Sequence, residues 1–161
     1  MIKILNLNEA TEHLTALAHW HHRQWSYLTP NESIEQRIKR MQAYLNNDLI
    51  PSTFIAEEDE LLGSAALVSH DMETMPQLSP WLASVYVSPS HRGKGVGTKL
   101  VLHVMTQAKL GSIDKLYLFT PDKKLFYQNL GWRLIGQEQY HGHLVAVMQA
   151  SLGKINIPDT V

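Results

Sequence analysis

The strongest constraint on the fold is a glycine-rich turn between an extended segment and an amphipathic one. It reads Val85-Tyr86-Val87-Ser88-Pro89-Ser90-His91-Arg92-Gly93-Lys94-Gly95-Val96-Gly97-Thr98. Glycines at 93, 95 and 97 permit positive φ angles and leave backbone N–H groups open to an anion. The helix that follows adds its unpaired first-turn N–H groups and its dipole. The pattern predicts a strand, turn and helix that bind a phosphate-bearing ligand, with Arg92 and Lys94 adding positive charge.

Length and composition limit the broad class of the protein. The chain has 161 residues, 44% of them hydrophobic, and a formal net charge of −1. We expect one domain over 1–152 with a tail over 153–161, and no partner among nucleic acids or membranes. The absence of cysteine excludes a disulfide, a thiolate metal site and a covalent cysteine intermediate. With no basic leader and no long apolar run, a soluble cytoplasmic protein is expected.

Apolar periodicity predicts an alternation of strands and helices. Asn8 is expected to cap a first helix, and Ser33 with Gln36 resembles a capping box for a second helix. An acidic turn at 57–60 predicts a hairpin, and Gly111 stands where a helix would end. The expected strands are 2–7, 53–56, 61–68, 82–87, 116–119, 132–135 and 144–149, with a loop over 70–80 and a short helix over 122–130.

Two well-known phosphate-binding loops do not fit the glycine spacing. A Walker A loop needs Lys and then Ser or Thr after its last glycine, whereas Gly97 is followed by Thr98 and Lys99. A dinucleotide loop needs G-x-G-x-x-G directly after a strand, but here the third glycine comes one position early. The loop therefore calls for a different phosphate ligand.

The pattern Arg92-x-x-Gly95-x-Gly97, preceded by Val85-Tyr86-Val87, resembles the acetyl-CoA loop of the GCN5-related N-acetyltransferase (GNAT) superfamily. Downstream, Tyr127-x-x-x-Gly131-Trp132 resembles that family's second motif. The resemblance implies an α+β, three-layer fold with a mostly antiparallel sheet of six to seven strands. It implies one splayed parallel pair of strands and helices on both faces of the sheet.

The resemblance also implies an activity, which is acetyl transfer from acetyl-CoA to a primary amine by direct attack in a ternary complex. The alternative is a non-catalytic acyl-CoA-binding sensor or interaction module. By resemblance, the backbone of the strand would hold the pantetheine arm, the glycine loop with Arg92 would hold the pyrophosphate, and Thr120 stands where many relatives have an asparagine that contacts the cofactor. The expected cofactor-binding residues are Val85, Tyr86, Val87, Arg92, Gly93, Lys94, Gly95, Val96, Gly97, Thr98, Thr120 and Tyr127.

Tyr127 matches the family tyrosine that protonates the leaving thiolate. A phenol with a pKa of about 10 is a reasonable donor to a thiolate with a pKa of about 8.5. The acceptor amine must also lose a proton before it attacks. The candidate bases are His70, Asp71 and Glu73, in the loop expected beside the cofactor strand, and nothing in the sequence decides between them.

The acceptor is expected to be a small-molecule or peptide amine, and its identity is open. Trp25 and Trp81 are candidate substrate-contacting residues. His19 and His22 could share a helix face but lack a third ligand, so we expect no metal. An exposed closing strand makes a homodimer conceivable.

Overall fold

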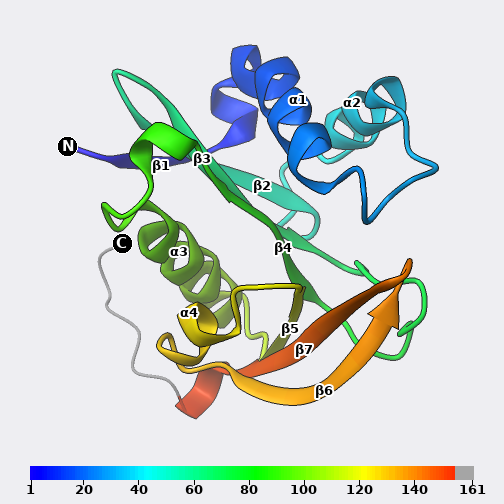
Figure 1. Ribbon diagram of the computed structural model, residues 1–161. Helices are drawn as coiled ribbons and strands as arrows, with labels where there is room; N and C mark the ends of the chain where they lie inside the picture. The colour runs from blue at the N-terminus through cyan, green and yellow to red at the C-terminus, as the bar shows by residue number, and fades with distance from the viewer. Residues whose placement is uncertain (155–161) are drawn as a thin grey trace.

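The computed structural model describes residues 1–154 and forms one mixed seven-stranded sheet in the order β1-β2-β3-β4-β5-β7-β6 (Figure 1). Every neighbouring pair is antiparallel except β4 and β5. The strands are β1 Lys3–Asn6, β2 Ser52–Glu58, β3 Glu60–Val68, β4 Trp81–Val87, β5 Lys115–Thr120, β6 Arg133–Tyr140 and β7 His143–Ser151. The helices are α1 Leu14–Trp25, α2 Ile34–Ala43, α3 Val96–Leu110 and α4 Lys124–Gln128.

Helices cover both faces of the sheet, as alternate residues of β2 show. Phe54 packs in the cluster that contains the apolar face of α3, whereas Ile55 packs in the cluster that contains α1 and α2. Successive side chains of a strand point to opposite faces, so α1 and α2 lie on one side and α3 and α4 on the other (Figure 1). The predicted α+β, three-layer fold is confirmed.

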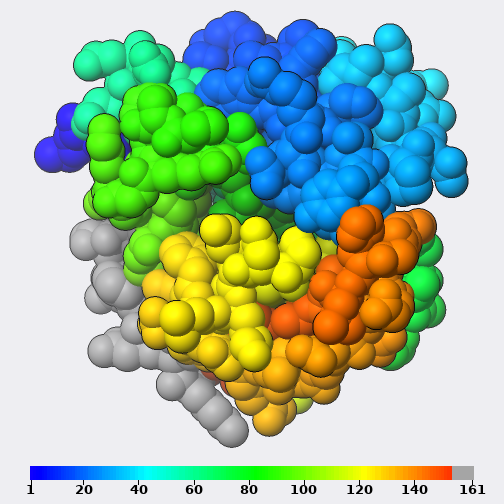
Figure 2. Space-filling view, in the orientation of Figure 1, coloured from blue at the N-terminus to red at the C-terminus, as the bar shows by residue number. Residues whose placement is uncertain are grey.

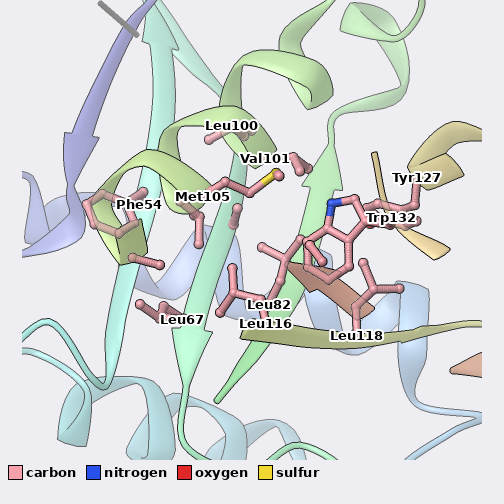
Figure 3. Packing of buried hydrophobic residues seen from close by; sticks show 14 of the residues in the cluster. Phe54, Leu67, Leu82, Leu100, Val101, Met105, Leu116, Leu118, Tyr127 and Trp132 are labelled. Atoms are coloured by element: carbon pink, nitrogen blue, oxygen red, sulfur yellow. The ribbon is translucent and has the colours of Figure 1, made fainter. Parts of the chain in front are cut away.

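The larger core lies between α3 and the sheet. Leu100, Val101 and Met105 of α3 face Leu116 and Leu118 of β5 in a fully buried cluster (Figure 3). Tyr127 and Trp132 close one end of the same cluster. The core therefore fixes the helix that follows the glycine turn and, at the same time, the tyrosine of the second motif.

The parallel pair diverges almost as soon as it forms. Within the described chain one Cα pair, Trp81 with Tyr117, joins β4 to β5, although both strands continue for several residues. Figure 1 shows the two strands moving apart beyond that point. The predicted splayed pair is confirmed, and it leaves the backbone of β4 without a strand partner on its β5 side.

A bulge interrupts the other side of β4. The register with β3 shifts between Ser64 and Ala66, so Ser84 and Val85 together oppose a single residue of β3. Ser84 has a φ of 53°, which non-glycine residues rarely adopt and which costs about 1–3 kcal/mol. The middle of β4 is thus irregular on one edge and unpaired on the other.

Several predicted elements differ from the structure in their ends. Asn8 does not cap the first helix: the Asn6 side chain caps a short 3-10 turn, and α1 begins only at Leu14. The capping box of Ser33 and Gln36 is present at α2, and the loop over 70–80 contains no helix or strand. β6 and β7 extend to a tight hairpin at 141–142, well beyond their predicted ends.

Gly111 ends α3 as its C-cap, as predicted. Its φ is −84°, and the positive φ of the turn belongs to Ser112. A Cβ on Gly111 would lie 2.5 Å from Leu49 Cδ2, so a larger residue there would displace the end of the Leu49 side chain. Residues 155–161, most of the tail predicted over 153–161, lie outside the described residues.

Gly63 is the glycine on which the sheet most depends, because a Cβ there would lie 2.2 Å from the Tyr86 carbonyl oxygen. We expect Gly63→Ala to lower the free energy of unfolding by about 1–3 kcal/mol or more, since backbone atoms of β4 must move. Gly136→Ala in β6 is the matched control, with no atom within 4 Å of its Cβ and an expected change within about 0.5 kcal/mol. Urea denaturation measures both, and equal stability of the two variants would contradict the close approach.

Candidate active site

One cavity of about 840 Å³ joins the glycine turn to the far side of the sheet. It passes along the opening between β4 and β5 and ends among the α1–α2 connection, the 69–80 loop and the β6–β7 hairpin. Figure 2 shows a hollow where the blue segment of α1, the green glycine-turn segment and the yellow segment near 120 meet. The cavity is thus lined by residues from both sides of the sheet.

The glycine turn forms the first end of the cavity. Gly93 and Gly95 have φ angles of 78° and 82°, and no atom lies within 4 Å of the position of a Cβ on either. Gly95 is also the N-cap of α3 and offers no side chain to the first-turn N–H groups. The turn therefore presents an open, donor-rich surface of the kind that binds phosphate. Val96, Gly97 and Thr98 line the cavity beside it.

The two cations of the turn differ in position. Arg92 lines the cavity; its Nε donates to the Val87 carbonyl at 2.8 Å, and its guanidinium lies over the Tyr86 ring. These contacts hold the charge at the mouth while leaving the terminal amino groups free for an anion. Lys94 is exposed and does not line the cavity, so the structure does not bring it to the expected site.

The strand residues predicted to hold a pantetheine arm lie along the cavity. Val85, Tyr86 and Val87 all line the cavity, and Val85 lies in the bulge. The Tyr86 ring points to the face of the sheet that α1 covers, where it packs against Trp20 and Trp25. The Val87 carbonyl already accepts a hydrogen bond from Arg92, which makes Val85 the freer of the two backbone partners predicted for the arm.

Thr120 lies at the end of β5 and lines the cavity, but its hydroxyl already has a structural role. Its Oγ1 accepts from the Lys123 N–H at 2.9 Å and closes the turn before α4. The hydroxyl hydrogen is still free to donate to a ligand. The residue thus fixes the turn that carries Tyr127 in addition to facing the cavity.

Tyr127 lines the middle of the cavity from α4. The residue is 7% exposed and packs edge-on against Trp132, and its hydroxyl makes no hydrogen bond within the described chain. Burial first, and then the Asp122 carboxylate, raises the pKa of Tyr127 above its usual value. The phenol therefore keeps its proton at neutral pH and can donate it when negative charge develops nearby.

The three candidate bases all line the second end of the cavity, but their surroundings differ. Asp71 is partly buried and makes no hydrogen bond within residues 1–154. Burial outweighs the lowering effects of Arg40 and Arg37 and, with a smaller contribution from Glu73, raises the pKa of Asp71 to about 6. A carboxylate with this pKa is a base at neutral pH with a usable affinity for a proton.

Glu73 and His70 are committed to other contacts. Glu73 accepts from the Tyr140 hydroxyl at 2.5 Å and pairs with His141 at 2.8 Å. Although partial burial alone would raise it, the hydrogen bond from Tyr140 and the neighbouring His141 leave the pKa of Glu73 below its usual value. His70 is exposed and contacts the Pro76 carbonyl through Nε2. Of the three candidate bases, Asp71 has the side chain best suited to accept a proton.

The two candidate tryptophans have different positions. Trp25 lines the cavity, with its ring beside the Arg37 guanidinium. Trp81 is fully buried away from the cavity, packs against Tyr117 and Phe119, and donates its indole N–H to the Leu78 carbonyl. The structure gives Trp81 a packing role at the join of β4 and β5, not a place beside a substrate.

A charged group at the second end of the cavity was not predicted from the sequence. Arg37 and Arg40 of α2 flank Glu32, and both arginines line the cavity. Arg37 is 5% exposed. The available signal was its position: residue 37 falls within the apolar stripe formed by Ile34, Ile38 and Met41, where a charged residue needs a buried partner.

No three His, Asp or Glu residues converge to hold a metal within the part of the chain that the structure describes. His21 is buried and bonded to Arg37 and Ser64. Between residues 1 and 154, no helix has the length and apolarity needed to span a bilayer.

A family model described as an acetyltransferase (GNAT) domain matches residues 51–134, which is more than half of the chain. The chain belongs to the GNAT acetyltransferase family. The matched region runs from β2 to the start of β6 and contains the glycine turn, the parallel pair and Tyr127. Members of the family use acetyl-CoA as the acetyl donor, so this protein is an acetyltransferase. No curated protein sequence matches the chain significantly.

Solved structures of the family share the whole fold. An acetyltransferase from Streptococcus agalactiae is 20% identical with a TM-score of 0.69, over 93% of this chain and 98% of that one. A Salmonella typhimurium protein solved with its cofactor acetyl-CoA is 18% identical with a TM-score of 0.70, over 100% and 99%. A spermidine N-acetyltransferase chimera from Vibrio cholerae and hSSAT is 16% identical with a TM-score of 0.69, over 95% and 96%. At these identities the likeness concerns the fold alone.

Proposed function

We propose that this GNAT acetyltransferase transfers an acetyl group from acetyl-CoA to a primary amine by direct attack while both substrates are bound. The observation that carries the proposal is the single cavity that runs from the glycine turn, past Tyr127, to Asp71. A donor bound at one end and an acceptor at the other would meet at the opening between β4 and β5. The absence of cysteine also agrees with transfer that forms no covalent cysteine intermediate.

The donor end fits a CoA pyrophosphate. The N–H groups of the turn and of the first turn of α3 would bind its oxygens, with Arg92 beside them. The unpaired edge of β4, chiefly at Val85, offers backbone hydrogen-bonding groups to the pantetheine amides. The thioester of acetyl-CoA supplies an activated acetyl group. The residues of this chain would bind and orient the two substrates and transfer protons.

Asp71 is the group proposed to take the proton from the acceptor ammonium, directly or through water. Its loop lies close to Arg37, and Arg37 donates to Ser84 Oγ on β4, so the carboxylate is near the strand proposed to carry the donor. Tyr127 is proposed to give its proton to the departing thiolate. The two residues face the same cavity, one toward the acceptor end and one beside the donor.

Charge at the acceptor end favours an amine with one ammonium group. Four carboxylates line the cavity. Asp122 lies beside Tyr127, Glu32 is paired with Arg37 and Arg40, and Glu73 is held by Tyr140 and His141. Asp71 is the remaining one, and it accepts no hydrogen bond within the described chain. A polyamine needs several carboxylates for its several charges, and this end offers one.

We therefore expect compact monoamines to be better acceptors than spermidine, with a higher kcat/KM at the same pH. Release of CoA thiol from acetyl-CoA, measured across a panel of mono-, di- and polyamines, checks this expectation. A clear preference for spermidine would contradict the proposal that the acceptor end binds an amine with one ammonium group. Tight acetyl-CoA binding without thiol release on any amine would instead favour a non-catalytic acyl-CoA-binding module.

Tyr127→Phe removes the proposed proton donor while keeping the ring that packs on Trp132. We expect kcat to fall by about 10²-fold or more, because positioned proton transfer contributes about that much. Tyr117→Phe is the matched control, since Tyr117 packs on Trp81 and does not line the cavity. A Tyr127→Phe enzyme with wild-type kcat would overturn the role of the phenol.

The pH profile tests Asp71. A base works only when deprotonated, so kcat/KM should rise with pH and show an inflection near the pKa of Asp71, about 6. We expect Asp71→Asn to lose this inflection and most of the activity that the wild-type enzyme gains as the pH rises above about 6. Asp59→Asn, in the exposed turn between β2 and β3, is the control and should keep the wild-type profile. An unchanged inflection in Asp71→Asn would assign the base elsewhere.

A further inference from the structure

A closed circuit of buried hydrogen bonds lies directly behind the bulge of β4. Arg37 Nη2 lies 2.9 Å from His21 Nδ1 and 3.2 Å from Ser84 Oγ. His21 Nε2 lies 2.8 Å from Ser64 Oγ, and the Ser64 hydroxyl donates to the Ser84 carbonyl at 2.9 Å. The circuit thus links α1, α2 and β3 and contacts Ser84 twice, once through its side chain and once through its backbone.

The direction of each hydrogen bond follows from the chemistry of arginine. A guanidinium only donates, so His21 Nδ1 must carry a lone pair and Nε2 must carry the hydrogen. Nε2 then donates to Ser64 Oγ, which leaves the Ser64 hydroxyl hydrogen for the Ser84 carbonyl. Burial, and then Arg37 and Arg40, hold the pKa of His21 well below its usual value, so the ring stays neutral as this arrangement requires.

The residue that the circuit contacts is the one that most needs support. Ser84 has a φ of 53° within the bulge, and the β5 side of β4 has no strand partner at this point. A serine or alanine in an ordinary strand would relax to extended φ angles. Two hydrogen bonds from buried groups, with Ser64 fully buried and His21 1% exposed, oppose that relaxation.

We propose that Arg37, His21 and Ser64 are positioning residues that hold the bulge of β4. The backbone of Ser84 and Val85 then faces the part of the cavity where the acetyl group is proposed to lie. None of the three needs to contact the reacting atoms. This inference rests on the proposed function, because it assumes that the acetyl group lies along β4. It goes beyond that function in assigning the conformation of the strand to a polar circuit on the opposite side of the sheet.

A purely structural role would be served better by apolar residues. His21 shares the inward side of α1 with Leu17 and Ala18, and Ser64 lies within the continuously buried part of β3. Polar groups buried at such positions give little net stability but can select one conformation over another. The conformation selected here is an irregular one, located where the two substrates are proposed to meet.

Ser64→Ala breaks the circuit with the smallest change of volume. Ser52→Ala is its matched control, because Ser52 is equally buried on the neighbouring strand β2 and donates to the Leu49 carbonyl away from β4. Both variants lose a buried hydrogen bond from serine to a backbone carbonyl, and a loss of stability from that bond affects both. Ser64→Ala loses in addition the bond that its Oγ accepts from His21 Nε2, which is the break in the circuit. Ser84→Ala, which removes only the Arg37 contact to the side chain, is a second variant should Ser64→Ala not fold.

Two readouts precede any assay of turnover. In the ligand-free protein, we expect Ser64→Ala to shift the backbone amide resonances of residues 84–86 and to speed their hydrogen exchange, and Ser52→Ala to do neither. Calorimetric titration with acetyl-CoA should show nearly unchanged affinity, because the glycine turn is intact. In turnover, kcat for Ser64→Ala should fall about tenfold or more, since small misplacements of reacting groups are costly.

Unchanged amide shifts and hydrogen exchange at 84–86 in Ser64→Ala would overturn the inference. If Ser64→Ala does not fold, unchanged hydrogen exchange at residues 85 and 86 in Ser84→Ala would overturn it. So would a Ser64→Ala enzyme whose kcat equals that of Ser52→Ala. If the wild-type protein turned over no amine at all, the proposed function would fail. The amide measurements on the ligand-free protein would still decide whether the circuit holds the bulge.

Discussion

The early separation of β4 from β5 is the constraint on which the site depends. A parallel pair normally satisfies the backbone groups on both facing edges, but here one Cα pair joins the strands and the remaining groups face a cavity. Unpaired backbone groups that are removed from water cost about 1–3 kcal/mol each, so such an edge persists only with solvent or a ligand against it. The fold therefore has a row of β4 backbone groups without strand partners beside the cavity.

The surrounding elements keep that opening from closing. Trp81 is fully buried and packs against Tyr117 and Phe119. This packing stabilises the one Cα pair that joins β4 to β5. Beyond that point, α3 packs beneath the sheet and contacts both β3 and β4. Glu73 ties the 69–80 loop to the β6–β7 hairpin through Tyr140 and His141, which encloses the acceptor end. Packed and hydrogen-bonded elements thus surround the opening on each side.

Sequence reasoning succeeded where function requires a local backbone shape. Gly93 and Gly95 adopt positive φ angles before α3 as predicted, and Ser33 with Gln36 forms its capping box. It was wrong where a long-range contact decides the outcome. Trp81 is a core residue whose ring packs against Tyr117 and Phe119 of β5. Those partners are distant in the sequence, and periodicity cannot supply them.

By itself, the sequence determined the donor end: the glycine spacing and the second motif define an anion-binding turn, and that turn uses backbone groups within a few residues of one another. Only the tertiary structure decided the acceptor end. It brought Asp71, Arg37 and Arg40 to one cavity, engaged Glu73 elsewhere, and joined His21 to Ser64 across two layers. The physical reason is that backbone conformation is set locally, whereas the pKa of a carboxylate and the partner of a buried side chain are set by whatever the fold packs around them.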